Sequence, residues 1–291
     1  MLNKMFVKFT KMHGAGNDFI VLETDDTQCD WSTVSKTMCD RRFGIGADGL
    51  LLLLPSKTAD FQIRMFNPDG SESDTCGNGL RCLVKYSVDH EIVKPDVRSI
   101  TVETGAGIRN AEFSKVSGKL IKIKVNMDEP KFKKDDIPMI IEQEEYVVDI
   151  KSMISYPLVI DGKELMLNLV SMGNPHAVYF CEEPVNEFPL SEMGPQVEHH
   201  KIFPQGVNFE IVRVIGKQNV EARVWERGAG ETLACGSGAC AIAVASQLHG
   251  YIDKKVEVKL PGGILEVEWD GAGDIFLSGP TETVFVGEWV V

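Results

Sequence analysis

The sequence predicts an α+β protein of two pseudo-symmetric domains, each a curled, mostly antiparallel sheet around a central helix. The first observation is an internal repeat: the pattern Cys-Gly-x-Gly begins at Cys76 and again at Cys235, 159 residues later. The second is that each copy opens an apolar stretch of helical length, while many short strand-like segments fill the rest of its half. One helix and many strands, repeated once, describe two copies of one domain.

Four further pairs of motif residues repeat at nearly the same spacing, with offsets between 157 and 160 residues. The pairs are Asn17 with Asn174, Asp48 with Asn208, Asn67 with Glu226, and Glu72 with Glu231. We therefore expect one domain from residues 1–120 together with 280–291, and a second from 121–279. Such a pair would face each other across a shared site.

Composition narrows the possible partners. The chain has 291 residues and a formal net charge of −13, without the basic clusters that nucleic acid requires, so we expect no nucleic-acid partner. The uncharged stretch 232–252 contains too much Gly, Ser, Gln and His for a membrane span, and we expect a buried helix and no membrane partner. No secretory signal is evident at residues 1–10, and seven cysteines without a disulfide-like framework favour a reducing compartment, the cytoplasm.

The first half is expected to begin with a hairpin. Residues 6–11 alternate apolar and polar side chains as a half-buried strand does, and the polar turn 13–18 leads into a second strand at 19–22. Residues 31–42 are weakly amphipathic and predict a helix. The remaining expected elements are a buried strand at 50–54, a strand at 61–66 ended by the turn 67–70, a helix from Cys76 to about His90, and strands at 99–103 and 120–125.

The second half repeats this plan. Residues 127–165 fit no clear pattern and are interpreted as solvated loops and edge strands, and an irregular segment precedes Gly206. The helix after Cys235 is apolar on all sides from Ala239 to Ala245, which predicts burial, and Gly250 would end it. The expected strands are 209–214, 221–225, 256–260, 264–269, 274–278 and 282–289.

A cysteine at a helix N-terminus lies beside unpaired backbone N–H groups and the positive end of the helix dipole. Both stabilise a thiolate, so Cys76 and Cys235 are expected to ionise readily, and both attract a carboxylate. A buried cysteine can also be a simple apolar residue, which is the interpretation we give to the other five. These are Cys29, Cys39, Cys82, Cys181 and Cys240.

Two thiols at matching positions suit inversion of a carbon centre, in which a proton leaves one face and another returns to the opposite face. The helix N-termini would stabilise the charge that develops on the adjacent carboxylate. Alternatives fit less well. A redox pair would typically be Cys-x-x-Cys, zinc would need further ligands at suitable spacing, and a serine hydrolase would need Gly-x-Ser-x-Gly.

Polar residues at turns and strand ends complete the candidate site. Asparagine at a turn can simply tolerate unusual backbone angles, but the repeat pairing of Asn17, Asn67, Asn174 and Asn208 favours ligand binding. Glu226-Arg227 is either a surface pair or a grip on an ammonium and a carboxylate. His176 is either a packed core histidine or a proton carrier near a thiol.

The motifs together resemble the diaminopimelate epimerase family. They are His-Gly-Ala-Gly-Asn-Asp-Phe (13–19), Gly-Ile-Gly-Ala-Asp-Gly (44–49), Phe-Asn-Pro-Asp-Gly-Ser-Glu (66–72), Cys-Gly-Asn-Gly-x-Arg-Cys (76–82), Gly-Asn-Pro-His (173–176) and Glu-Arg-Gly-Ala-Gly-Glu-Thr-x-Ala-Cys-Gly-Ser-Gly-Ala (226–239). The resemblance implies an epimerase that uses neither pyridoxal phosphate nor metal and interconverts LL- and meso-2,6-diaminoheptanedioate in lysine and peptidoglycan precursor synthesis. It also implies the family fold, two similar domains that each wrap a sheet around a helix.

The resemblance further implies roles for individual residues. Cys76 and Cys235 would be the acid–base catalysts, assisted by His176 and Glu226. The reacting carboxylate would lie on the helix ends, and other polar groups would hold the amino groups and the distal carboxylate, the latter on Arg227. The implied binding residues are Asn17, Asn67, Gly77, Asn78, Asn174, Asn208, Glu226, Arg227, Gly236 and Ser237. Some members have Gln where this chain has Gly49, so any contact there would come from backbone.

Two alternatives stay open from the sequence. One is another thiol-pair isomerase of the same architecture, such as a proline racemase or a phenazine-pathway isomerase, whose mono-carboxylate substrate would have no use for Arg227. The other is a non-catalytic amino-acid-binding or thiol-redox protein. The oligomeric state is also open, a homodimer included.

Overall fold

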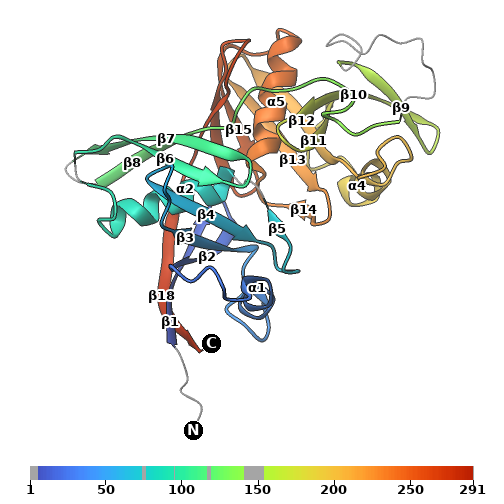
Figure 1. Ribbon diagram of the computed structural model, residues 1–291. Helices are drawn as coiled ribbons and strands as arrows, with labels where there is room; N and C mark the ends of the chain where they lie inside the picture. Colours follow the sequence, from blue (N-terminus) through green and yellow to red (C-terminus); the bar gives the residue numbers. More distant parts are fainter. Residues whose placement is uncertain (1–5, 74–76, 95, 117–118, 141–153, 291) are drawn as a thin grey trace. The chain divides into compact units, whose positions relative to one another are not determined.

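The computed structural model describes residues 6–73, 77–94, 96–116, 119–140 and 154–290 (Figure 1). Cys76, the first predicted catalyst, lies outside the described residues. The chain divides into two compact units, and each is described by itself. Unit 1 comprises Met1–Asn126 with Ser278–Val291, and unit 2 comprises Met127–Leu277.

Unit 1 contains two helices and nine strands within its described residues. The helices are α1 (Trp31–Cys39) and α2 (Gly77–Asp89). The strands are β1 (Phe6–Gly14), β2 (Asn17–Glu23), β3 (Gly49–Leu54), β4 (Phe61–Phe66), β5 (Glu72–Ser73), β6 (Ser99–Thr104), β7 (Gly107–Val116), β8 (Lys119–Asn126) and β18 (Glu282–Val290).

The strands of unit 1 form a mixed sheet that brings the chain's last strand beside its first. β18 pairs antiparallel with β1, and β1 forms the expected hairpin with β2. β2 then runs parallel to β3, β3 antiparallel to β4, and β4 antiparallel to β5 and parallel to β6, which continues into the antiparallel pairs β6–β7 and β7–β8. Every residue of β3 is buried, as its continuous apolar run predicts.

The two helices of unit 1 begin and pack for identifiable reasons. Asp30 caps α1, because its carboxylate accepts a hydrogen bond from Thr33 N (3.1 Å). α2 packs against β1, β2, β3 and β8, with Leu80, Leu83 and Val84 almost fully buried. The helix therefore lies inside its sheet, as the sequence predicts.

Unit 2 contains the helices α4 (Leu190–Glu198) and α5 (Gly236–Leu248). Its strands are β9 (Tyr156–Ile160), β10 (Lys163–Ser171), β11 (Pro175–Phe180), β12 (Asn208–Gly216), β13 (Asn219–Glu226), β14 (Gly230–Thr232), β15 (Lys255–Leu260) and β16 (Gly263–Glu268), and β17 (Phe276–Ser278) crosses the boundary between the units.

Unit 2 repeats the strand pairing of unit 1. β11 runs parallel to β12, β12 antiparallel to β13, and β13 antiparallel to β14 and parallel to β15, which pairs antiparallel with β16. The same sequence of parallel and antiparallel pairs links β2 to β7. This agreement confirms the α+β fold class and the internal repeat.

α5 is the buried helix of unit 2. Ala239 to Ala245 are at most 2% exposed, and the helix packs against β10, β11, β12, β15 and β16. Gly250 follows its end with φ of +70°, the left-handed conformation expected of a glycine after a helix. In the described part of the chain no helix combines the length and apolar character needed to cross a membrane.

The sequence analysis missed one helix. α4 lies in the segment interpreted as irregular, because Gly194 and Pro195 interrupt its pattern. Burial of Leu190, Met193 and Val197 in the core of unit 2 overrides this poor local propensity. Gly194 is required there, since a Cβ atom would lie 2.5 Å from the Trp225 ring. Of the segment 127–165, residues 141–153 lie outside the described residues.

Candidate functional site

In unit 1 the strand order places three predicted site residues at one edge of the sheet. Asn17 begins β2, Gly49 begins the parallel strand β3, and Asn67 follows the end of antiparallel β4. A Cβ atom on Gly49 would lie 3.1 Å from Phe66 O and 3.4 Å from the Phe19 ring, so there is little room for a side chain. Any ligand contact at Gly49 would come from the backbone, as expected.

A chain of hydrogen bonds joins this edge to the first turn of α2. Asn17 Nδ2 donates to Asp48 Oδ2 (2.9 Å), and Asn78 Nδ2 donates to Asn17 Oδ1 (3.2 Å). Arg81 Nη2 donates to Asn78 Oδ1 (2.7 Å), and Arg81 Nη1 donates to Gly77 O (3.2 Å). A carboxylate at one end and a fully buried guanidinium at the other thus orient both amides.

Ion pairs next to Asn17 hold the two aspartates of this region, Asp18 and Asp48. Arg41 donates to Asp18 (2.7 Å) and to Asp48 (2.6 Å), and the buried Lys11 ammonium lies 2.5 Å from Asp18. Burial opposes ionisation of Asp18, but the hydrogen bonds from Arg41 and Lys11 outweigh it and lower its pKa from 3.8 to about 2. Asp18 is therefore a carboxylate throughout the physiological range.

Asn67 has a local partner in its own turn. Its Nδ2 donates to Ser71 Oγ (2.9 Å), and its backbone N–H donates to Ser71 O (2.8 Å). Gly70, with φ of +84°, closes this turn. Asn67 thus lies at the same edge of the sheet as Asn17 and Gly49, and Ser71 accepts a hydrogen bond from its side-chain amide.

Unit 2 brings its predicted residues to the corresponding edge. His176 in β11 pairs with Asn208 in parallel β12, and Phe209 pairs with Trp225 in β13, one residue before Glu226. Asn208 Nδ2 donates to Pro175 O (2.8 Å), which joins the first residues of the two parallel strands. Asn174, directly before β11, places its Oδ1 3.0 Å from His176 Nε2.

Cys235 is the N-cap residue of α5. Gly238 N donates to its Sγ atom at 3.4 Å, and Ser237 Oγ lies 3.4 Å from the same sulfur. Nevertheless, burial, followed by the charges of Glu226 and Glu210, raises the thiol pKa well above its ordinary value. The prediction that this cysteine ionises readily is therefore wrong for the free protein, because desolvation and two carboxylates outweigh the helix terminus.

Glu226 ends β13 close to that thiol. Thr232 Oγ1 donates to its Oε1 at 2.5 Å. Burial of the carboxyl group raises its pKa, and hydrogen bonds with Thr232 and Cys235 only partly offset this effect. The raised pKa shifts this carboxyl group toward the protonated form that a general acid needs.

Arg227 lies on the surface side of the same turn. Its backbone N–H donates to Asn208 Oδ1 (2.9 Å), and its Nη1 donates to Gln205 O (3.2 Å), while its side chain is exposed. Gly228 N donates to Glu198 Oε1 (2.8 Å), and Trp225 Nε1 donates to Glu198 Oε2 (2.7 Å). Asn208 and Glu198 therefore hold the backbone N–H groups of the turn, and the guanidinium of Arg227 is exposed with one backbone acceptor, Gln205 O.

Sequence reasoning missed three residues of this neighbourhood. Glu210 lies fully buried in β12 with its Oε1 2.6 Å from His176 Nδ1. The available signal was a lone acid inside the apolar run Phe209 to Val212. Glu198 gave no signal because its helix was missed, and Thr232 lies in a glycine-rich turn that offered no pattern.

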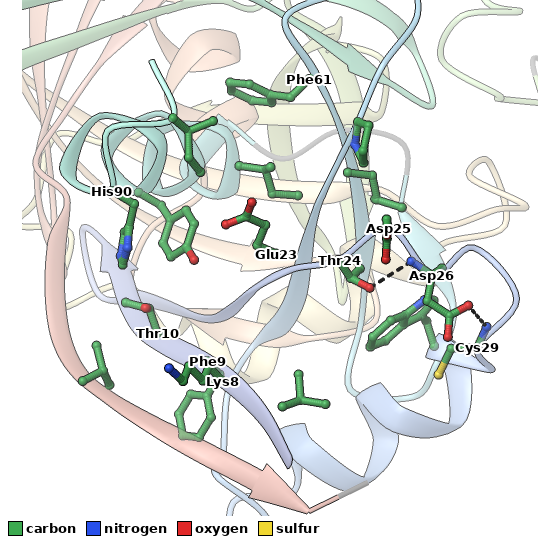
Figure 2. A pocket seen from close by; sticks show the side chains of 18 of the residues that line it. Lys8, Phe9, Thr10, Glu23, Thr24, Asp25, Asp26, Cys29, Phe61 and His90 are labelled. Carbon is green, nitrogen blue, oxygen red and sulfur yellow. Dashed lines mark hydrogen bonds between the residues drawn. The ribbon is translucent and has the colours of Figure 1, made fainter. Parts of the chain in front are cut away.

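A separate hollow lies in unit 1 away from the predicted site residues. It has a volume of about 1250 Å³ and is lined by β1, β18, the end of β2 and the end of α2 (Figure 2). Lys8, Glu23, Asp26 and His90 contribute polar groups to its wall. None of the predicted catalytic or binding residues that the structure describes lines it.

Comparison with known proteins gives close relatives. A family model described as diaminopimelate epimerase matches residues 9–133 and 168–284. Diaminopimelate epimerases of Acetivibrio thermocellus and Methanococcus maripaludis are each 47% identical to the chain, over 284 and 286 residues respectively. Both alignments cover 97% of this chain, with 98% of the first relative and 99% of the second.

Solved structures of lower identity share the fold. A phenazine biosynthesis protein of the PhzF family from Bacillus anthracis superposes with a TM-score of 0.71 at 18% identity, covering 99% of this chain and 100% of its own. A hydroxyproline epimerase from Agrobacterium vitis gives a TM-score of 0.72 at 14% identity, covering 100% and 94%. At these identities the likeness shows the fold alone.

Proposed function

The chain belongs to the diaminopimelate epimerase family, and from this premise we propose that it interconverts LL- and meso-2,6-diaminoheptanedioate without pyridoxal phosphate or metal. The observation that carries the proposal is the grouping in unit 2. Cys235 begins α5, the Glu226 carboxyl group interacts with it, and Arg227 follows in the same turn. An isomerase of this kind needs a proton donor, a carboxylate site and a distal clamp, and these residues can supply all three.

We assign one thiol to each unit, with each unit acting as one epimerase domain. One cysteine removes the α-proton from one face of the substrate, and the other returns a proton to the opposite face. In the free protein Cys235 is the thiol, so in one direction it is the donor and Cys76 the acceptor. In the reverse direction the roles exchange.

The helix ends stabilise the reacting carboxylate. The N–H groups of Gly236 and Ser237 in α5, and of Gly77 and Asn78 in α2, have no earlier helical turn to bond to. Together with the helix dipoles they favour the negative charge that builds on the carboxylate when the α-carbon loses its proton. The small residues after each cysteine allow a close approach of the ligand.

The remaining polar groups fix the substrate and assist the proton transfers. Glu226 and His176 assist Cys235, because the Glu226 carboxyl group is hydrogen-bonded to the thiol and is charge-coupled to His176. Arg227 holds the distal carboxylate through a planar two-point contact. Backbone at Gly49 and the amides of the edge residues hold the amino groups and remaining oxygens. These amides belong to Asn17, Asn67, Asn174 and Asn208.

A mono-carboxylate substrate is the competing assignment, since a hydroxyproline epimerase shares the fold. A mono-carboxylate substrate would not need the exposed guanidinium of Arg227, whose turn is held by the side chains of Asn208 and Glu198. Incubation with LL-diaminopimelate in D₂O tests the choice, with proline and hydroxyproline in parallel. We expect α-deuteration and conversion of diaminopimelate alone. Deuteration of the cyclic amino acids instead would overturn the assignment.

We further propose that the protein works as a homodimer in the cytoplasm, where two catalytic thiols stay reduced. β18 supports the dimer, because Val284, Phe285 and Val286 are 55%, 46% and 69% exposed on a strand at the surface of unit 1. An exposed apolar strand of this kind is a ready surface for a second copy. Sedimentation should give twice the chain mass, and Val286→Glu should shift it toward the monomer. A wild-type monomer at micromolar concentration would refute the dimer.

A further inference from the structure

Glu210 is a buried carboxylate to which the proposed function gives no role. It lies in β12 between Val178 of β11 and Val224 of β13, and it is 0% exposed. Its Oε1 atom lies 2.6 Å from His176 Nδ1, whereas its Oε2 atom has no hydrogen-bond partner in the described part of the chain. A buried carboxylate oxygen without a partner is costly for stability alone, which suggests a functional reason for the residue.

Glu210 faces the first turn of α5, close to the catalytic thiol. A Cβ atom added to Gly238 would lie 2.9 Å from Glu210 Oε1 and 3.4 Å from Cys235 Sγ. The carboxylate and the sulfur therefore flank the same small gap, which only glycine leaves open. Glu210 is thus within electrostatic reach of the Cys235 thiol.

Four ionisable groups share this dry region: Cys235, Glu226, Glu210 and His176. A thiolate and two carboxylates cannot all be charged together in a buried site, because each additional negative charge raises the cost of the next. The short contact of His176 Nδ1 with Glu210 gives Glu210 the one basic partner among the four. The geometry thus pairs Glu210 with the imidazole, whereas burial raises the pKa values of Cys235 and Glu226.

We propose that Glu210 is a positioning residue of the epimerase site: it fixes the His176 ring through Nδ1–H and keeps Cys235 as the thiol that delivers a proton. The raised pKa values of Cys235 and Glu226 agree with this role, since the Glu210 charge contributes to both. The imidazole can donate to Glu210 only if Nδ1 carries hydrogen, so the contact fixes both the orientation of the ring and the protonation of that nitrogen. The role in turnover rests on the proposed function, but the effect on the thiol does not.

The test is the pH dependence of Cys235 alkylation by iodoacetamide in the full chain, followed at the Cys235 peptide by mass spectrometry. Alkylation follows the thiolate fraction, so its midpoint reports the thiol pKa independently of how accessible the sulfur is. Glu210→Gln keeps the shape of the side chain and removes its charge. We expect the midpoint to fall by about one pH unit, a roughly tenfold faster reaction below it, while kcat/KM falls.

Glu198→Gln is the matched control. Glu198 is also buried in unit 2, but its oxygens accept from Trp225 and Gly228 and its charge is not among those that act on Cys235. Its alkylation midpoint should equal that of the wild type. An unchanged midpoint in folded Glu210→Gln would overturn the proposal, and so would equal shifts in both variants, which would indicate general loosening.

The wild-type protein decides the matter if Glu210→Gln does not fold. Long-range ¹⁵N correlation spectra of labelled histidine should show His176 Nδ1 protonated from about pH 6 to 9, and the Cys235 midpoint should lie above the ordinary value of about 8.5. An unprotonated Nδ1 or a midpoint below that value would contradict the proposal. Neither measurement needs substrate, so a failure to deuterate diaminopimelate would overturn the proposed function and leave this result standing.

Discussion

The first turn of α2 and the first turn of α5 occupy the same place in two copies of one strand arrangement, yet different ionisable groups lie around them. Within α2 lies the buried guanidinium of Arg81, which donates to Asn78 and Gly77. Beside α5 lie the buried carboxyl group of Glu210 and the half-buried Glu226. A positive neighbour favours an ionised group of negative charge, and negative neighbours favour a protonated one.

The corresponding positions show that the difference is local. β3 answers to β12 in the repeat, and it carries Leu50 and Leu51 where β12 carries Glu210. Asn67 stands where unit 2 has Glu226, and Cys240 stands where unit 1 has Arg81. The backbone pattern was kept while a few buried side chains changed. The thiol at the start of α5 therefore lies among carboxyl groups that have no counterpart at the matching positions of unit 1.

The largest expected effect comes from removing either thiol. Cys76→Ala and Cys235→Ala should each abolish epimerisation, because inversion needs a proton transfer at both faces. Serine variants should be nearly as inactive, since a hydroxyl is a much poorer acid–base group near neutral pH. Any residual α-proton exchange should be confined to the face whose cysteine remains, so LL and meso substrates should show opposite preferences in the two serine variants.

Both variants should be measured for exchange and for epimerisation with both isomers, after circular dichroism has shown that they fold. A one-base mechanism predicts one inactive variant and one almost normal variant. A near-normal rate in either would refute the assignment of one thiol to each unit.

The sequence predicts the repeat and the helix ends because these depend on local signals: glycine spacing, turn residues and hydrophobic periodicity. It does not predict Glu210 or Glu198, because each acts through contacts between segments distant in sequence. Glu210 meets His176 from the neighbouring strand, 34 residues earlier, and Glu198 meets Trp225, 27 residues later. Only the strand order reveals these contacts.

The ionisation of Cys235 shows the same limit. A helix N-terminus is visible in the sequence and predicts a thiolate. Burial and the nearby Glu226 and Glu210 charges act in the opposite direction and are larger. Local sequence therefore places Cys235 at the helix N-terminus, whereas tertiary packing raises the pKa of its thiol.

A second prediction concerns Arg227, the proposed clamp for the distal carboxylate. Unit 1 has no arginine at the matching position, because Pro68 follows Asn67. In Arg227→Lys the ammonium cannot reproduce a planar two-point grip on a carboxylate. Loss of one charge-assisted contact costs roughly 1.5–3 kcal/mol, so kcat/KM for diaminopimelate should fall about 10- to 100-fold. Lys217→Arg, on the surface of the same unit, serves as the control. An unchanged kcat/KM would make Arg227 a surface residue without a substrate contact.

A third prediction concerns Arg81, the buried cation of α2 in unit 1. Arg81→Met keeps much of the side-chain volume but removes the guanidinium that donates to Asn78 Oδ1 and Gly77 O. Unfolding free energy should fall by about 1–3 kcal/mol, because two buried hydrogen bonds from a charged donor are lost. Leu80→Met, a buried neighbour in the same turn, should cost less than about 1.5 kcal/mol. Equal losses in the two variants by urea unfolding would mean that Arg81 contributes only volume.

The smallest expected effect lies behind the edge of unit 1, where Asp18 links Lys11 and Arg41. Because its pKa falls from 3.8 in the unfolded chain to about 2 in the folded protein, the Asp18 carboxylate stabilises the fold wherever it is ionised. This contribution is fully present above about pH 4 and is lost as the pH falls through about 2. Asp18→Asn should therefore lower Tm by a few degrees at pH 7, and the difference from wild type should shrink steadily below pH 4.

Glu226→Gln is the control for this pH dependence. Within the described residues neither Glu210 nor Glu226 forms an ion pair with a lysine or arginine, so the Tm difference between Glu226→Gln and wild type should not shrink in the same way at low pH. A difference between Asp18→Asn and wild type that stayed constant from pH 7 down to the acid limit of folding would show that the charge of Asp18 is not what stabilises the turn.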